Sequence, residues 1–193
     1  MGIASTGSRA ACALALAMGM AACSRVGGID ASNVSPISND DTYATLGYLW
    51  SGAQGAIDRE REPSASPFTL TLNYQLPCTR GGSGSYQGTL SGTQSGGTGN
   101  ASLAVTGALA ACQFDNTVSV TTISSSGVTV TGTIAMSAGT WGTVNLHMVA
   151  PSVTVNGVAC PGGVDVTLTG PSLSAQLTSS GTACGRTGDV LLP

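Results

Sequence analysis

The sequence predicts a mainly β protein: an antiparallel, strongly curved sheet or sandwich of about nine strands, with one N-terminal helix packed on it. Two observations support this prediction. From Ser66 onward, apolar residues alternate with polar ones, which is typical of strands with one buried and one solvent-facing side. Ahead of that region, between residues 40 and 62, apolar residues recur at spacings of three and four, as they do along one face of a helix.

The composition agrees with a sheet protein. Charged residues make up 8% of the chain and apolar residues 41%, a combination unlike that of disordered segments. Gly, Ser and Thr are abundant, which suits short strands joined by glycine turns. The chain has no lysine and a net charge of −3, so it cannot neutralise many phosphates. Nucleic acid is therefore not expected as a partner, nor is attachment to anionic lipid through a polybasic patch.

The first two dozen residues have the layout of an export signal. Arg9 is the only charge ahead of an apolar run from Ala10 to Ala22, which is shorter than the roughly 20 residues needed to span a bilayer. Small residues at Ala21 and Ala22 stand directly before Cys23. This arrangement is typical of a secretory signal peptide with a small-residue cleavage site.

The segment Met20-Ala21-Ala22-Cys23 resembles the lipobox of bacterial lipoproteins. The resemblance implies that residues 1–22 are removed and that Cys23 becomes the lipidated first residue, which attaches the protein to the membrane through acyl chains. Because Ser24, rather than aspartate, follows the cysteine, the resemblance also implies sorting to the outer membrane. The alternative is an ordinary signal peptide cut at an upstream Ala-x-Ala site, which would leave an apolar stub on the mature chain.

Residues 23–39 are predicted to form the lipidated N-terminus and a flexible tether, and residues 40–193 a single domain. Asp40 and Asp41 are suited to the start of a helix. The apolar face of this helix would consist of Tyr43, Leu46, Trp50, Ala53 and Ile57. Three glycines count against a helix here, because each costs up to ~1 kcal/mol in a helix interior: Gly47, Gly52 and Gly55.

The alternating pattern predicts strands that include residues 70–76, 86–90, 103–109, 118–123, 128–136, 144–148, 153–155, 164–168 and 173–177. The glycine-bearing segments 95–100 and 125–127 are expected to be hairpin connections. The outward side of these strands carries Thr and Ser rather than charge. Because open edges with so few charges invite pairing with other chains, closure into a barrel or a covered edge is expected.

Four cysteines follow the proposed lipidated one: Cys78, Cys112, Cys160 and Cys184. An even number in an exported domain indicates two disulfides, with three possible connectivities. The segments 78–82 and 160–163 are faintly similar, and each is followed by a second cysteine, which favours the pairs Cys78–Cys112 and Cys160–Cys184. No C-x-x-C spacing occurs and the single histidine is distant, so no metal site is predicted.

The usual catalytic constellations are absent from the sequence. A Ser-His-Asp triad would require His147, which alternates with Leu146 and Met148 and is expected to be exposed on a strand. Asp115 and Asp165 are the candidate carboxylates of a hydrolase, but nothing in the pattern brings them together. Residues 82–88 mimic a phosphate loop with the wrong spacing and are expected to form a hairpin. We therefore predict no catalytic, cofactor-binding or metal-binding residue.

The predicted function is that of a membrane-anchored exported lipoprotein, acting as a structural or interaction module of the cell envelope. The alternative is a carrier of a lipid or another hydrophobic ligand, bound on the apolar inner face of the curved sheet. An enzyme is the least favoured class. The first two hypotheses differ over the inner face. If it is packed solidly against Leu46 and Trp50 it leaves no room for a ligand, whereas a helix that stands off would leave a cavity.

Overall fold

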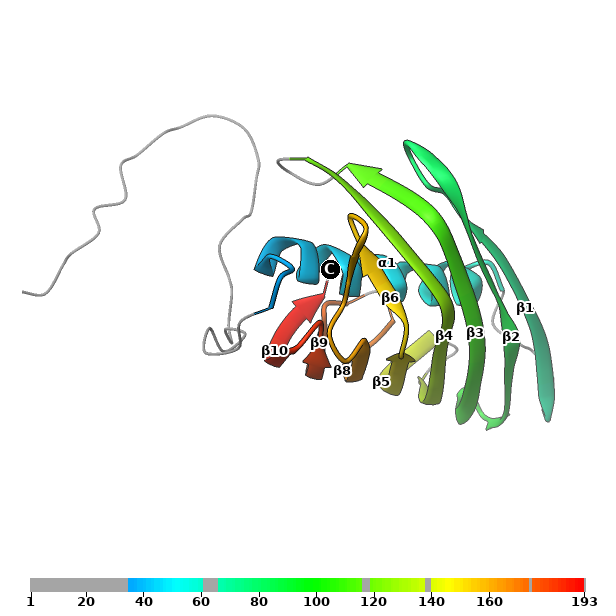
Figure 1. Ribbon diagram of the computed structural model, residues 1–193. Helices are drawn as coiled ribbons and strands as arrows, with labels where there is room; N and C mark the ends of the chain where they lie inside the picture. The colour runs from blue at the N-terminus through cyan, green and yellow to red at the C-terminus, as the bar shows by residue number, and fades with distance from the viewer. Residues whose placement is uncertain (1–34, 61–65, 116–118, 138–139, 174, 193) are drawn as a thin grey trace, which may run out of the picture.

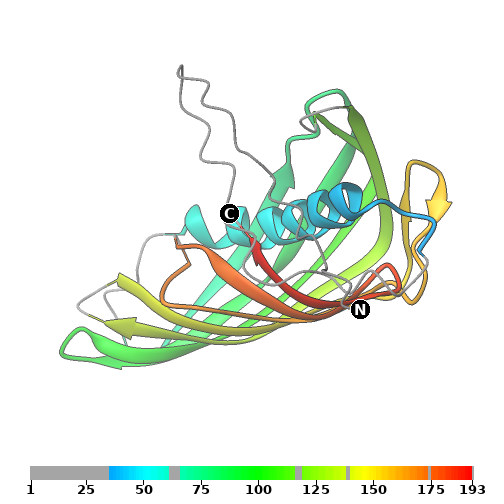
Figure 2. The same ribbon diagram turned by 90° about the vertical axis from the view of Figure 1, so that its left-hand side faces the viewer.

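The computed structural model describes residues 35–60, 66–115, 119–137, 140–173 and 175–192. Within these residues the chain forms one helix and a single ten-stranded antiparallel sheet. The strands curve together around the helix, which lies across the concave side (Figures 1 and 2). The predicted mainly β class and the single packed helix are thus confirmed, and the arrangement is the curved sheet rather than the sandwich.

The helix precedes all the strands in the chain. The elements are α1 (Asn39–Asp58), β1 (Phe68–Leu76), β2 (Gly81–Ser95), β3 (Thr98–Asp115), β4 (Val120–Ser137), β5 (Thr140–Ala150), β6 (Val153–Val155), β7 (Val158–Ala159), β8 (Val164–Gly170), β9 (Leu177–Ala183) and β10 (Arg186–Leu192). The sheet order is β1-β2-β3-β4-β5-β8-β9-β10. The small β6–β7 hairpin lies off this path and pairs with the first half of β4, whose second half pairs with β5.

The sheet is not closed into a barrel: β1 and β10 are its two ends and do not pair with each other. Of the two expected ways to protect the open edges, closure into a barrel is therefore not the one adopted. The helix instead fills the space that closure would enclose, and it contacts β1, β2, β3, β4 and β10. An open sheet whose concave side is occupied by a helix buries its apolar face without a complete ring of strands.

Helix α1 begins at a well-formed cap. Ser38 has extended backbone dihedrals, and its hydroxyl oxygen accepts a hydrogen bond from the Asp41 backbone N–H at 3.0 Å. Asp40 and Asp41 lie in the first turn, where the helix dipole favours negative charge. The predicted apolar face is confirmed for Leu46, Trp50, Ala53 and Ile57, each at most 1% exposed, whereas Tyr43 is half-buried.

Two of the three glycines that counted against a helix mark the places where α1 approaches the sheet most closely. A methyl group on Gly52 would overlap ring carbons of Tyr86, and one on Gly55 would lie 2.5 Å from Cζ of Tyr74. On its other side the Tyr86 ring also lies against Gly107 of β3, where an added Cβ would lie 2.5 Å from Cδ1. Tyr86 is therefore held between two glycines, one in the helix and one in the sheet.

The hydroxyl of Tyr86 completes this contact. It donates a hydrogen bond to the carbonyl oxygen of Leu49 at 3.0 Å, so the polar end of a fully buried side chain is satisfied by the helix. Burial raises the pKa of the Tyr86 hydroxyl far above its usual range, so the group remains a neutral donor. This interaction fixes the height of α1 over the sheet.

The strand boundaries differ from the prediction in several places. Residues 82–88, expected to form a hairpin, lie within β2, and the short strand β7 was not predicted. Residues 118–123 and 128–136 were expected to be separate strands, but β4 runs through both, and residues 125–127 lie within it rather than in a hairpin. The register of β3 with β4 shifts between Gly107 and Cys112. At this irregularity the alternation of inward- and outward-facing residues changes, although both strands continue. Consequently Thr121 and Ile123 face inward, while Val120 is 43% exposed; Val118 lies outside the described residues.

The C-terminal strands were also misplaced. The ninth strand was expected over residues 173–177, but β9 begins at Leu177 and pairs with a final strand, β10, that was not predicted. Leu173 is buried in the preceding loop, where its carbonyl oxygen accepts a hydrogen bond from Gln54 Nε2 of α1. Glycines at 181, 185 and 188, all with positive φ, interrupt the apolar alternation from which strands are predicted.

Both predicted disulfides are present with the favoured connectivity. Cys78 bonds Cys112, joining the β1–β2 connection to β3, and Cys160 bonds Cys184, joining the loop before β8 to the β9–β10 turn. Cys112 and Cys184 are fully buried. The two bridges therefore tie together the connections at two separate points along the sheet.

Candidate binding face

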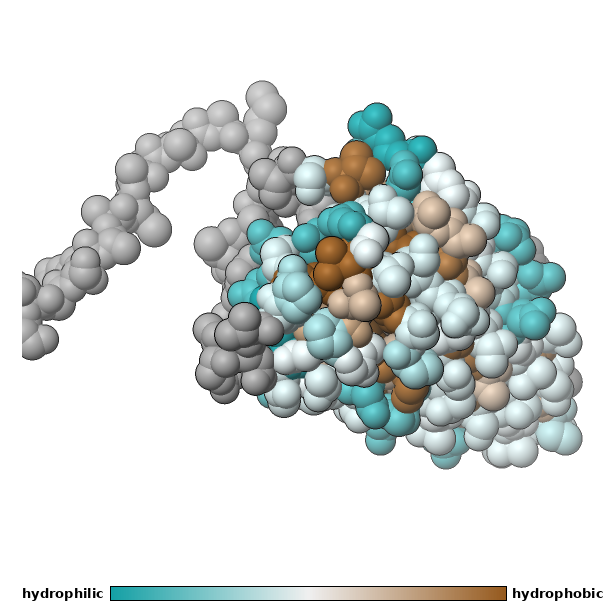
Figure 3. Space-filling view, viewed as in Figure 1, coloured by the Kyte–Doolittle hydropathy of each residue, from teal (hydrophilic) through white to brown (hydrophobic). Residues whose placement is uncertain are grey.

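The outer, convex face of the sheet carries a regular array of short polar side chains. Its pairing register defines an outer row that crosses the main sheet, consisting of Thr71, Thr89, Ala104, Thr131, His147, Thr167, Ser180 and Asp189. A second row beside it consists of Asn73, Gln87, Thr106, Thr129, Val149, Asp165, Thr182 and Thr187. The predicted Thr-rich outer side is thus a continuous surface. In Figure 3 most of the visible surface is pale, neither strongly hydrophilic nor strongly hydrophobic.

A shallow hollow of about 430 Å³ lies over the β1–β4 part of this surface. Its lining combines hydroxyl, amide and methyl groups without any charge: Thr71, Asn73, Gln87, Thr89, Ala104, Thr106, Thr129 and Thr131, with backbone from Leu72, Gly88 and Val105. A second hollow of about 390 Å³ lies beside the shifted part of the β3–β4 pairing and is lined by Ser and Ala residues together with Gln75, Gly84 and Leu109. Such surfaces suit a neutral partner that exchanges hydrogen bonds with hydroxyl groups.

The charged residues of the outer face lie over the C-terminal strands. His147 Nε2 lies 2.7 Å from Asp165 Oδ1, and the Ser180 hydroxyl donates to Asp189 Oδ1 at 2.6 Å. The His147 side chain is 51% exposed, which confirms the predicted surface position. In the register, Thr167 stands between His147 and Ser180, so the histidine does not reach that hydroxyl. These contacts do not form a nucleophile–base pair.

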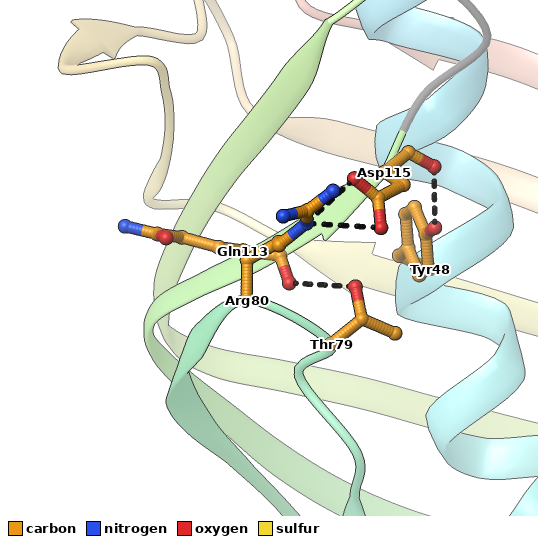
Figure 4. Close-up of polar contacts among 5 residues, drawn as sticks. All are labelled: Tyr48, Thr79, Arg80, Gln113 and Asp115. Carbon is orange, nitrogen blue, oxygen red and sulfur yellow. Dashed lines mark hydrogen bonds and ion pairs between the residues drawn. The ribbon is translucent and has the colours of Figure 1, made fainter.

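Asp115, the other candidate carboxylate, belongs to a separate cluster at the end of β3 (Figure 4). Arg80 Nε donates to both carboxylate oxygens of Asp115, at 2.9 and 3.2 Å. The carbonyl oxygen of Gln113 accepts from the Thr79 hydroxyl and from the Arg80 backbone N–H. Asp115 and Asp165 are therefore engaged with different partners and do not act as a carboxylate pair.

Tyr48 connects this cluster to the helix. Its ring stacks on Phe114, with centroids 3.3 Å apart, and its hydroxyl donates to the Asp115 carbonyl oxygen at 3.4 Å. Burial, together with the nearby Asp115 carboxylate, raises the pKa of the Tyr48 hydroxyl. At the other end of α1, burial raises the pKa of the Asp58 carboxyl. The Tyr48–Phe114 stack and the hydrogen bond to Asp115 position α1 against β3.

The concave face is filled by the helix. The sheet residues named as the lining of a possible ligand cavity are mostly packed: Leu72, Val105, Val130 and Leu146 are at most 1% exposed, and Leu70, near the β1 edge, is half-buried. Leu46 and Trp50 of α1 belong to the same core. Two polar atoms inside it, Trp50 Nε1 and Ser179 Oγ, have no hydrogen-bond partner.

The structure describes no group of three or more His, Cys, Asp or Glu residues able to hold a metal ion. Within the same residues, no helix is long and apolar enough to cross a membrane.

Cys23, the signal segment 1–22 and most of the tether lie outside the described residues. Sequence reasoning did not find the hollow over β1–β4, because strand register is needed to bring its lining together.

No known protein family matches the chain, and no significantly similar curated protein or solved structure was found.

Proposed function

We propose that this protein is an exported lipoprotein, held to the cell envelope by acyl chains on Cys23, whose folded domain acts as an interaction module. The single observation that supports the interaction module is the difference between the two faces of the sheet. The concave face is occupied by α1, while the convex face presents an uncharged array of Thr, Asn and Gln side chains with a hollow of about 430 Å³. The open face is the one available to a partner.

The proposed anchor is supported by the residues Met20-Ala21-Ala22-Cys23 and by the presence of two disulfides, which persist in exported proteins. With few cations and no polybasic patch, the domain has little electrostatic attraction for anionic lipid, so stable attachment requires acyl chains. The outer membrane is the proposed location, because Ser24 follows the cysteine.

Replacing Cys23 by serine is expected to abolish lipid attachment, whereas Cys12→Ser leaves it intact. Cys12 lies within the apolar run, and it provides a matched control for the loss of a cysteine from the leader. The measurement is the intact mass of the protein extracted from membranes of cells that produce each variant. If the wild-type product carries no acyl mass, or if both serine variants retain it, the proposed anchor is wrong.

The interaction module is tested by photo-crosslinking from the hollow in intact cells. A photoreactive amino acid at Thr106 is expected to capture one envelope component, because this side chain faces the open hollow. The control position is Asn100, which is also exposed but lies near the β2–β3 turn, outside the hollow. Equal labelling from both positions, or none from either, would contradict a role for this face.

The carrier is retained as the second candidate because of the unpartnered Trp50 Nε1 and Ser179 Oγ inside the core. Buried polar groups normally have a hydrogen-bond partner, so these two atoms are where a polar group of a ligand or an internal water would bind. A carrier would release a stoichiometric lipid on denaturation, whereas the interaction module would not.

A further inference from the structure

β1 forms one end of the sheet, and its outer edge is unpaired among the described residues, because β1 pairs with β2 alone. Its sequence, FTLTLNYQL, contains no charge, proline or glycine. Its register with β2 is uninterrupted over the whole strand. Natural sheets protect exposed edges with charges, prolines, bulges or covering segments, and the strand itself carries none of the first three.

The opposite end of the sheet differs. β10 carries Arg186 and Asp189, and Gly188 has a φ of 156°. The Arg186 guanidinium also donates from Nη2 to the Ile37 carbonyl oxygen at 2.6 Å, which places the segment before α1 next to the start of β10. Thus β10 has the protective features that β1 lacks.

One hydrogen bond indicates which backbone groups of β1 face outward. The backbone N–H of Gln94 donates to Ser66 Oγ at 3.0 Å, and Ser66 lies two residues before the Phe68–Gly92 pair, opposite Gln94. Gln94 therefore directs its N–H toward the β1 side. Because backbone groups alternate in direction along a strand, the even-numbered β1 residues face β2. The outward N–H and C=O groups then belong to Thr69, Thr71, Asn73 and Gln75.

We propose that the β1 edge binds the β1 edge of a second copy of this chain, antiparallel, with a two-fold axis through Leu72. The two sheets would then continue into one. This association does not depend on the proposed function of the outer face. In this pairing, the outward N–H and C=O groups of the two β1 strands hydrogen-bond to each other.

The side chains of β1 are self-complementary in this register. On the outer side, Thr71 lies opposite Asn73 of the second copy and Thr69 opposite Gln75, so each rung joins two neutral polar side chains. On the inner side, Leu70 lies opposite Tyr74 of the second copy and Phe68 opposite Leu76. Leu70 and Tyr74 are only half-buried in the single chain, and the second strand would cover them. No rung places like charges together.

A two-fold arrangement also limits the assembly to two copies. Each β1 edge is used once, so the contact is isologous and closed. Pairing of β1 with β10 of another copy would be heterologous and would bring the strand against Arg186 and Asp189. The features of the two edges favour the closed pair.

The test is disulfide trapping between two full-length copies in membranes of the producing cell. One copy carries Thr71→Cys and one epitope tag, and the other carries Asn73→Cys and a different tag. Paired residues in an antiparallel ladder lie about 5.5 Å apart between Cα atoms, within the range of a disulfide. We expect a cross-linked product that carries both tags. The control pair, Thr71→Cys with Thr187→Cys on the exposed outer side of β10, is expected to remain uncross-linked.

A charged variant tests the same register by disrupting it. Thr69→Lys with Gln75→Lys places lysine opposite lysine across the two-fold axis, and the yield of the 71–73 product is expected to fall by about tenfold. The native disulfides of each variant report that the chain has folded. Absence of the 71–73 product from folded protein overturns the proposal. A product with Thr187→Cys, or one with another protein in place of the second copy, overturns it as well.

Discussion

Gly52→Ala is expected to destabilise the protein by about 2 kcal/mol, whereas Gly47→Ala in the same helix stabilises it by about 0.5–1 kcal/mol. Alanine favours a helix at both positions, but only at Gly52 does the added methyl group overlap the Tyr86 ring. Apart from the adjoining residues and the backbone of the helix itself, no atom lies within 4 Å of the corresponding methyl position on Gly47. Urea unfolding followed by tryptophan fluorescence, to which Trp50 and Trp141 both contribute, measures both variants.

The Tyr86 ring cannot move aside at low cost. It is fully buried, lies directly against Gly107 on its far side and donates its hydroxyl hydrogen to Leu49. A double-mutant cycle isolates this contact, because the cost of Gly52→Ala is expected to shrink by more than half once Tyr86 is replaced by leucine. Equal effects of Gly52→Ala and Gly47→Ala, or an unchanged cost in the leucine background, would show that this close approach does not position the helix.

Removal of either disulfide is expected to cost about 3–4 kcal/mol. The bridges close loops with sequence separations of 34 and 24 residues, and the chain-entropy model assigns nearly equal stabilisation to loops of these sizes. The variants are Cys78→Ala with Cys112→Ala and, separately, Cys160→Ala with Cys184→Ala. Urea midpoints compared at constant slope give the loss of unfolding free energy.

A reductant provides the internal control for this prediction. It should lower the unfolding midpoint of the wild-type protein and have no effect on the variant that lacks all four cysteines. A wild-type midpoint that does not respond, or four thiols that react freely in the folded protein without reductant, would contradict the two bridges.

The fold class was predictable because the apolar alternation from Leu70 onward is strict where one side of a strand is buried. The positions of the bends were not. The β3–β4 pairing is shifted near residues 107–112, and the serine and glycine residues at 125–127 have the composition of a hairpin although they lie within a strand. Composition alone does not distinguish a bulge from a turn, because both require the same small residues.

In the helix, two residues that counted against the prediction are the ones that the packing requires. Gly52 and Gly55 weakened the helix prediction, yet they are the residues that let α1 approach Tyr86 and Tyr74. Local propensity was overridden by two tertiary contacts, between residues 34 apart in the chain for Gly52 and Tyr86 and 19 apart for Gly55 and Tyr74. The hollow on the outer face could not be predicted for the same reason. Thr71 and Thr131 line it because the β1–β2, β2–β3 and β3–β4 pairings place them in one row across the sheet.

The cysteine pairs were favoured by a faint internal similarity, and the structure has them. The anchor at Cys23 remains a prediction from the sequence.

Native mass spectrometry of the membrane-extracted protein, before and after denaturation, is the most direct test of a concave face filled by its own helix. We expect the same mass per chain in both states, that of a chain beginning at Cys23 with its covalent acyl groups and two disulfides, whether the native spectrum contains single chains or pairs. A lipid or other apolar molecule that is bound at one per chain in the native spectrum and lost on denaturation would contradict it.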